Sequence, residues 1–201
     1  ADLTSSSRTC WLFGGNSEGS AHWFAAGRIY ECQILTNNVL ARSFKPVVDG
    51  NGEACMFDEV EQKLYRNGGT GSFTAGPRPG SGEEEETGEK PWYLVEYLES
   101  TGTQYVDTDL PAHTNTQTDV GYQYRYVDSQ WANGDMISGV QSPSRYYTVS
   151  LRGTTALKEG NVYGADEATR TYPEFYRHEL CFNDARRNLV LDGNVLGAFT
   201  A

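Results

Sequence analysis

Short apolar runs alternate with polar residues along this chain, and clusters of Gly, Asn, Asp and Ser separate them. Residues 116–126 show the clearest alternation, which places Val120 and three tyrosines on one face of a strand. Residues 155–173 lack clear periodicity and are predicted to contain loop. No segment shows a convincing helical period, so we expect an all-β chain. The pattern predicts strands at residues 9–13, 21–35, 39–47, 54–58, 63–66, 93–98, 104–108, 116–126, 134–140, 145–152, 174–183, 187–191 and 195–200.

One segment interrupts this pattern. Residues 76–91 contain no apolar residue other than proline and are rich in Gly and Glu, which is typical of a linker. We therefore divide the chain into residues 1–75, a linker at 76–91, and residues 92–201.

Charge narrows the choice of partners. The formal net charge is −11, and Glu83–Glu86 with Glu89 supply five of the negative charges within the linker. A nucleic-acid-binding face needs basic residues to neutralise phosphates, so we do not expect nucleic acid as a partner. No apolar run approaches the roughly 18 residues of a membrane-spanning helix, so membrane insertion is not expected either.

The most specific phrase lies at residues 92–110 and reads WYLVEYLESTGTQYVDTDL. It resembles the opening of a laminin-G-like, concanavalin A-like jelly-roll module that occurs in tandem in secreted bacterial and phage-associated proteins. Residues 27–76 resemble the C-terminal half of that module. The opening phrase thus follows the closing half along this chain, which is the reverse of the family order.

The resemblance implies an out-of-register, circularly permuted cut through a tandem array. Residues 1–75 would be the C-terminal half of one module and residues 92–201 the N-terminal half, so that joining residue 201 to residue 1 restores a complete module. The implied fold is a two-sheet antiparallel jelly-roll sandwich, completed in cis by permutation or in trans with a neighbouring chain. Tethering through the linker gives an effective concentration near the millimolar range, so we expect cis closure for an isolated chain.

Catalytic residues were sought because some concanavalin-type folds are glycoside hydrolases with paired carboxylates. Residues 58–61, Asp-Glu-Val-Glu, fall in a predicted turn, where exposed charge is ordinary. Glu96 and Glu99 are three apart on a predicted strand and would face opposite sides. No short spacing typical of a nucleophilic triad or a metal site involves His22, His113 or His178. We therefore expect no enzymatic activity.

Glycan binding is the alternative function. In the loop predicted at residues 128–135, Trp131 lies among polar groups that include Asn133 and Asp135. Trp23, beside His22 and near Asn16, is a second candidate platform. Aromatic faces combined with amide and carboxylate groups are the chemistry that lectin-like sandwiches use for sugars. A tryptophan in such a loop can equally plug the end of the sandwich core.

Metal and thiol chemistry give weaker signals. Asp128 and Asp135 are candidate Ca²⁺ ligands, as in some laminin-G relatives, and no other cofactor is expected. The sequence lacks a close C-x-x-C pair, so a zinc site is not expected. Cysteines in apolar strands usually behave as small buried hydrophobes, and a disulfide stays open as an alternative. The cysteines are Cys10, Cys32, Cys55 and Cys181.

These observations favour a non-catalytic structural or adhesive repeat unit of an extracellular fibre or giant surface protein. The expected location is secreted or at the cell surface. The expected partners are neighbouring copies of the chain, with extracellular glycans as the alternative.

Overall fold

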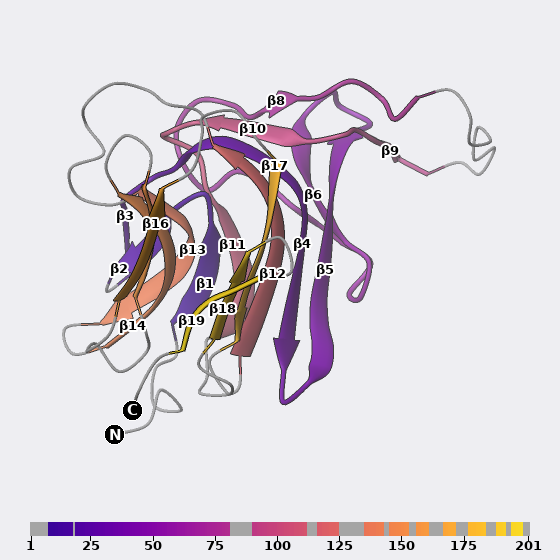
Figure 1. The fold of residues 1–201 in the computed structure, drawn as a ribbon. Coiled ribbons are helices and arrows are strands. Elements are labelled where there is room, and N and C mark those ends of the chain that lie inside the picture. Colours follow the sequence, from indigo (N-terminus) through magenta and orange to yellow (C-terminus); the bar gives the residue numbers. More distant parts are fainter. Residues whose placement is uncertain are drawn as a thin grey trace.

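In the computed structural model the protein is all-β. The structure describes residues 8–17, 19–80, 90–111, 116–124, 135–142, 145–152, 156–160, 167–171, 177–183, 188–191 and 194–198. Within these ranges the strands form two sheets whose neighbours are antiparallel, apart from one short parallel pair (Figure 1). The described residues contain no helix long and apolar enough to cross a membrane.

The first sheet follows the order β11-β1-β13-β14-β15-β16. Two short strands extend it: β2 pairs with β13, and β3 pairs with β2. β2 and β13 are the parallel pair. The bounds are β1 (Thr9–Leu12), β2 (Gly15–Ser17), β3 (Ser20–His22), β11 (Val106–Pro111), β13 (Asp135–Ser142), β14 (Arg145–Arg152), β15 (Ala156–Gly160) and β16 (Glu167–Thr171).

The second sheet follows the order β19-β18-β17-β12-β4-β5-β6-β7. Three short strands extend it: β9 pairs with β5, β10 pairs with β4, and β8 pairs with β10. The main strands are β4 (Ala26–Thr36), β5 (Val39–Asp49), β6 (Ala54–Asp58), β7 (Lys63–Tyr65), β12 (Thr116–Tyr124), β17 (Arg177–Asn183), β18 (Asn188–Leu191) and β19 (Asn194–Ala198). The attached strands are β8 (Thr74–Ala75), β9 (Trp92–Leu94) and β10 (Leu98–Thr101).

The core is sandwich-like, because both sheets contribute fully buried apolar side chains to it. Burying such a side chain typically stabilises a fold by about 1.5–3 kcal/mol. The largest fully buried residues are Leu12, Phe13, Ile29, Ile34, Phe44, Met56 and Leu98.

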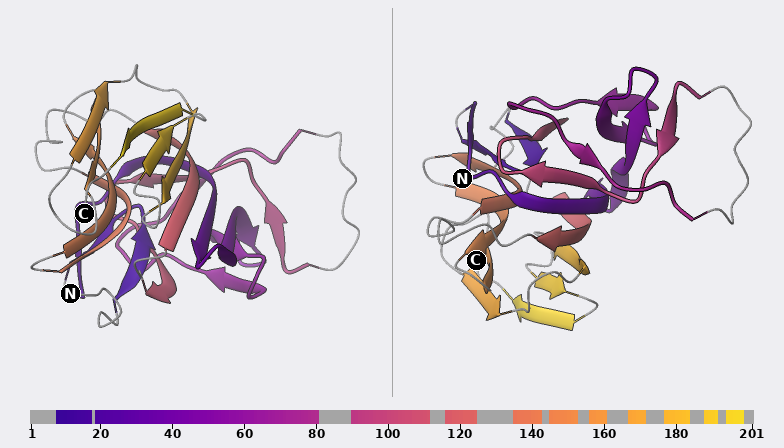
Figure 2. Two further views of the ribbon diagram at one scale, coloured as in Figure 1. Left: turned by 60° about the horizontal axis from the view of Figure 1, so that its bottom comes forward. Right: turned by 90° about the horizontal axis from the view of Figure 1, so that it is seen from above.

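Strands from the two sides of the linker alternate within each sheet. β1 lies between β11 and β13, and the first half of β4 lies between β10 and β12. In Figure 1 the indigo β1 is accordingly flanked by the pink β11 and the orange β13, and both views of Figure 2 show the same mixing of early and late colours.

A fork between β4 and β5 receives the segment after the linker. The two strands pair as far as Cys32 and Phe44 and then diverge. Beyond that point β9 pairs with β5, and β10 pairs with β4. The Pro46 carbonyl accepts a hydrogen bond from Val95 N at 3.1 Å. The N–H and C=O of a strand residue point to the same side of the strand, so an N–H at position 46 would also face this fork. Proline has no N–H, and the residue is placed where the pairing of β5 is interrupted.

This fork corrects the single strand predicted at 93–98. The chain forms β9 on β5, crosses the fork, and then forms β10 on β4. Tyr93 and Leu94 are 40% and 43% exposed, although the alternation pattern treats them as ordinary strand residues. The predicted strand is therefore divided because its two parts pair with different strands, β5 and β4. The periodicity of a sequence does not show which strand a segment pairs with.

Two further expectations differ from the structure. Residues 155–173, where the sequence pattern predicts no strand, contain β15 and β16; β15 pairs with β14, and β16 pairs with β15. The strand predicted at 21–35 is divided into β3 and β4, and Trp23 between them has a left-handed backbone with φ of 51°. In both places sheet pairing overrides the local pattern.

The Ser-Thr-Gly-Thr segment at residues 100–103 is organised by the buried side chain of Gln104. Gln104 Oε1 accepts hydrogen bonds from Ser100 Oγ at 3.0 Å and from Thr101 N at 2.9 Å. The loop at 67–71 packs closely against this turn, and Thr70 N donates to Thr103 O at 3.0 Å. At Gly69 a Cβ atom would lie only 2.1 Å from Thr103 O. Glycine is therefore needed there for close backbone approach.

We predict that Gly69→Ala lowers the free energy of unfolding by about 2–3 kcal/mol, because the added methyl group must displace backbone. Gly80→Ala is the matched control, since a Cβ there meets nothing within 4 Å, and its effect should stay under about 0.5 kcal/mol. Urea unfolding followed by tryptophan fluorescence measures both. Equal stabilities for the two variants would contradict the close contact between the 67–71 loop and the 100–103 turn.

Candidate functional site

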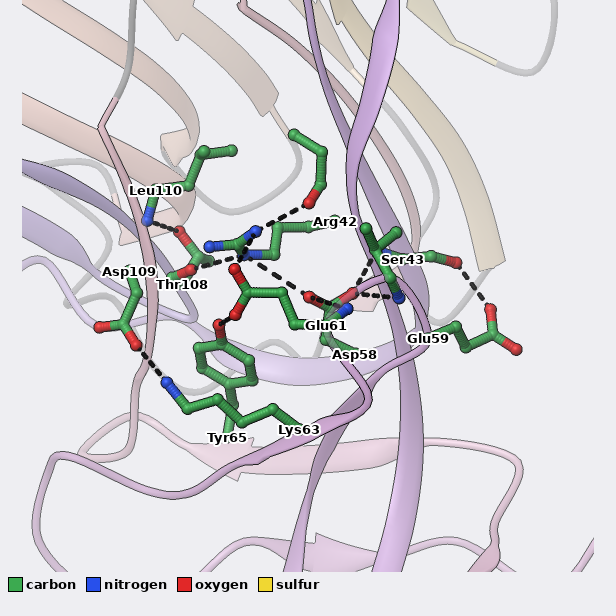
Figure 3. A network of polar contacts seen from close by, with 12 residues as sticks. Arg42, Ser43, Asp58, Glu59, Glu61, Lys63, Tyr65, Thr108, Asp109 and Leu110 are labelled. Atoms are coloured by element: carbon green, nitrogen blue, oxygen red, sulfur yellow. Dashed lines mark hydrogen bonds and ion pairs between the residues drawn. The ribbon is translucent and has the colours of Figure 1, made fainter.

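A buried charged network joins the two sheets at Arg42 of β5 (Figure 3). Arg42 is 8% exposed, and its Nε donates to the Thr108 carbonyl of β11 at 3.0 Å. The same nitrogen lies 3.6 Å from Asp58 Oδ2, and Nη1 lies 2.8 Å from Glu61 Oε1. One guanidinium thus connects β5, the turn after β6, and β11 of the other sheet.

Asp58 is fully buried at the end of β6. Its Oδ1 accepts hydrogen bonds from Ser43 N at 2.8 Å and from Val60 N at 3.1 Å. Its Oδ2 accepts from Glu61 N at 3.4 Å. The predicted turn at 58–61 is confirmed, but the expectation of an exposed charge is wrong for Asp58. The carboxylate bonds N–H groups of its own turn and of Ser43, and the Arg42 guanidinium lies beside it, so these groups enclose it.

The carboxylate of Glu61 is also engaged by the fold. Oε1 pairs with Arg42, and Oε2 accepts a hydrogen bond from Tyr65 Oη at 2.7 Å. Burial, followed by this hydrogen bond to Glu61, raises the pKa of Tyr65 above its ordinary value. At the exposed rim of the network, Lys63 Nζ lies 2.6 Å from Asp109 Oδ2. The carboxylates of this network are thus bonded to Arg42, Tyr65, Lys63 and backbone N–H groups, and these contacts hold strands together.

Glu96 and Glu99, the other candidate catalytic carboxylates, have different surroundings. Glu96 is exposed in the short segment that connects β9 and β10. Glu99, in β10, accepts from Arg28 Nε of β4 at 2.7 Å. The Arg28 guanidinium also lies over the ring of Tyr97, 4.2 Å from its centroid. These contacts bind β10 to β4.

Among the sequence-predicted glycan ligands, the structure describes the side chain of Trp23 alone. Trp131 and Asn133 lie outside the described residues, as does Asp128 of the calcium hypothesis. Asp135 is the first residue of β13, and its side chain is also outside the described part. Trp23 directly follows β3, which is linked to β13 through β2. The structure therefore places Trp23 next to a strand of the sheet that contains Asp135.

Trp23 and its neighbours belong to two groups of aromatic contacts. The Trp23 ring is 5.3 Å from that of the exposed His22. The next residue, Phe24, lies 6.2 Å from Tyr105, which stacks on the buried Trp11 at 4.0 Å. Trp23, Phe24 and Tyr105 are each partly exposed, so each presents some aromatic surface to solvent.

Asn16 does not contribute a polar group to these aromatic contacts. Its side chain is 4% exposed, its Nδ2 donates to Thr9 O at 3.1 Å, and its Oδ1 accepts from Gly19 N at 2.9 Å. Both ends of the amide are thus used by the backbone, one at the start of β1 and the other in the turn after β2. The expected cluster of Asn16 with His22 and Trp23 is reduced to the two aromatic residues.

A second acidic turn follows β5. Asp49 Oδ1 accepts hydrogen bonds from Asn51 N at 2.8 Å and Glu53 N at 2.9 Å, and Arg66 contacts both Asp49 and Glu53. The hydrogen bond from Glu53 N, together with Arg66, lowers the pKa of Asp49. Across the described residues no group of three or more His, Cys, Asp or Glu side chains is arranged to hold a metal ion.

Three cysteines are free and buried, as expected for small core residues. Burial raises the pKa of Cys10 to about 12, with a further contribution from Asp107, and burial raises that of Cys55 to about 12. The pKa of Cys32 is raised as well, for the same primary reason. Such thiols are poor nucleophiles. The side chain of Cys181 lies outside the described part.

Sequence reasoning missed Arg42 and Thr108 because no motif marks them. The available signal was an arginine within the apolar strand predicted at 39–47, with an aspartate closing the strand at 54–58. A charge in a strand that is otherwise buried requires a nearby partner.

Comparisons with family models, with curated proteins and with solved structures found no match to this chain. The laminin-G-like resemblance of residues 92–110 therefore stays a prediction from the sequence.

We predict that Asp58→Ala destabilises the protein by about 3–5 kcal/mol, because it leaves Arg42 and several turn N–H groups buried without their partner. Lys63→Met is the matched control, since it removes the exposed ion pair with Asp109 and should cost at most about 1 kcal/mol. Chemical denaturation at neutral pH measures both. A loss for Asp58→Ala no larger than that for Lys63→Met would show that the buried network contributes little.

Proposed function

We propose that this protein is a structural or adhesive repeat unit of an extracellular fibre or large surface protein, with a concanavalin A-like jelly-roll architecture and no catalytic role. The observation that carries the proposal is that the segments before and after the linker are side by side. Thr74 and Ala75 of β8 pair with Glu99 and Leu98 of β10. Gly76 N also donates to Tyr97 O, and Glu96 N to Pro77 O, both at 2.8 Å.

This adjacency suits a chain of modules. In the module order implied by the resemblance, residues 92–101 begin a unit and residues 74–77 end it. When the two ends of a unit lie together, units can be joined through a linker without distorting either sheet. The acidic, Pro-containing composition of residues 76–91 favours an extended connection. The fold supports this assembly but does not by itself fix a function.

The absence of a catalytic role is supported by how the described acidic groups are used. Asp58, Glu61, Glu99 and Asp49 each bind an arginine, and two of them also organise a turn. A glycoside hydrolase instead needs two carboxyl groups that converge on the same bond. In the described part, the contacts of these four residues serve the fold.

The proposal predicts that a rearranged chain, in which residues 92–201 precede residues 1–75 and the linker is removed, folds cooperatively. Its free energy of unfolding should lie within about 2 kcal/mol of that of the natural order, because every strand pairing is retained and only connectivity changes. Circular dichroism and urea unfolding test this. A rearranged chain that stays unfolded would overturn the repeat-unit interpretation.

Glycan binding is the second candidate, favoured by the partly exposed aromatic side chains of Trp23, Phe24 and Tyr105. It predicts saturable binding to at least one member of a panel of soluble glucans, mannans and chitin oligosaccharides. Trp23→Ala or Trp131→Ala should then reduce affinity at least tenfold with nearly unchanged melting temperature. The structural role predicts no saturable binding and no release of reducing ends. Isothermal titration and a reducing-sugar assay on the same panel distinguish these outcomes.

A further inference from the structure

Each sheet contains a slot that is filled by a strand from the other side of the linker. In the first sheet β11 and β13 both belong to residues 90–198, and β1 of residues 8–80 lies between them. In the second sheet β10 and β12 belong to the later segment, and residues 26–29 of β4 lie between them. Without the earlier segment, neither sheet of the later one is continuous.

The contacts that line these slots are buried and specific. Trp11 aligns with Asp107 on one side and with Gly139 on the other. Thr108 Oγ1 donates to Cys10 O at 2.7 Å, in the interior and across the boundary between the segments. Arg42 bonds Thr108 O across the same boundary. Both faces of β1 are covered in this slot, because the consecutive residues Cys10, Trp11 and Leu12 are all buried.

These contacts do not depend on the two segments belonging to one chain. The covalent connection between them runs through residues 76–91, and the pairings listed above involve none of its residues. The strands β1 and β4 of a second copy would therefore make the same pairings with the same register. Exchange of identical elements between copies has a low cost for this reason.

We propose that residues 90–198 act as an acceptor for β1 and β4 of a second copy of this chain, so that copies associate by exchanging segments. The partner is thus another molecule of the same protein, and the interaction surface is the pair of slots. Cis closure dominates at low concentration, because the linker holds the two segments near the millimolar range relative to each other. Exchange is favoured when copies are crowded or are folded together. The biological meaning of segment exchange rests on the proposed structural role. The experiment that tests the exchange is independent of that role.

Complementation between two inactivated full-length chains tests the proposal. One variant carries Leu12→Asp and Ile29→Asp, and the other carries Leu98→Asp and Val106→Asp; all four side chains are fully buried. Each variant alone should lack a cooperative transition, since two charges enter the core of its single cis module. Refolded together from urea in equal amounts, they can build one module from the intact segment of each.

The expected result is recovery of a cooperative transition with about half the wild-type amplitude per chain, in a species of twice the 22.3 kDa chain mass. Wild-type protein refolded in the same way establishes that refolding succeeds. A mixture of the first variant with Phe44→Asp plus Met56→Asp is the matched control. Those positions are also fully buried but lie in the same segment, so no recovery is expected.

Absence of recovery in the complementary mixture, with normal refolding of the wild type, would overturn segment exchange. Equal recovery in the same-segment mixture would overturn it too, because that signal could not come from the slots. If one of the variants folds by itself, a second experiment replaces the complementation test. Two differently tagged wild-type chains are refolded together at about 1 mM, near the effective concentration that the linker provides. Mixed species must then form, and their absence would overturn the proposal. Failure of the rearranged chain bears on the repeat-unit role and leaves this result unaffected.

Discussion

The interaction on which the rest of the structure depends is the bond between Arg42 and the Thr108 carbonyl. β11 bulges against β1 at this point, since the register between them shifts between Thr9 and Trp11. The hydroxyl of Thr108 bonds β1, and its carbonyl bonds the guanidinium of Arg42 from the other sheet. Arg42 is itself held by Asp58, so the position of one sheet relative to the other is tied to the turn that begins β7. Neither buried charge can be removed without leaving its partner in a low-dielectric interior.

Much of the fold could be predicted from the sequence because most strands follow local alternation and end at Gly, Asn or Asp. The strands at 39–49, 54–58, 116–124 and 145–152 are found close to their predicted bounds. The failures occur where a non-local neighbour decides. β15 pairs with β14 despite weak periodicity, and residues 92–101 form two strands because β4 and β5 diverge around them.

The candidate site was less predictable, for a related physical reason. Aromatic residues near polar ones suggest a sugar platform, but the sequence does not show which polar groups are already used. Asn16 illustrates this, since both ends of its amide are bonded to nearby backbone groups. Conversely Asp58 is at the end of a strand and reads as an ordinary surface charge, whereas its turn and Arg42 enclose it. Satisfaction of hydrogen bonds is a three-dimensional property that local spacing does not record.

The position of β1 between two late strands also determines the order in which the protein can form. β4 to β7 are consecutive hairpins, so they can assemble from nearby residues as soon as these are available. β1 has to wait for partners about a hundred residues further along the chain, at Asp107 and Gly139. Such long-range pairing slows folding, because loop entropy is lost before the contacts form. During synthesis β1 leaves the ribosome well before β11 and β13, so its edges stay unpaired and available to chaperones throughout that interval.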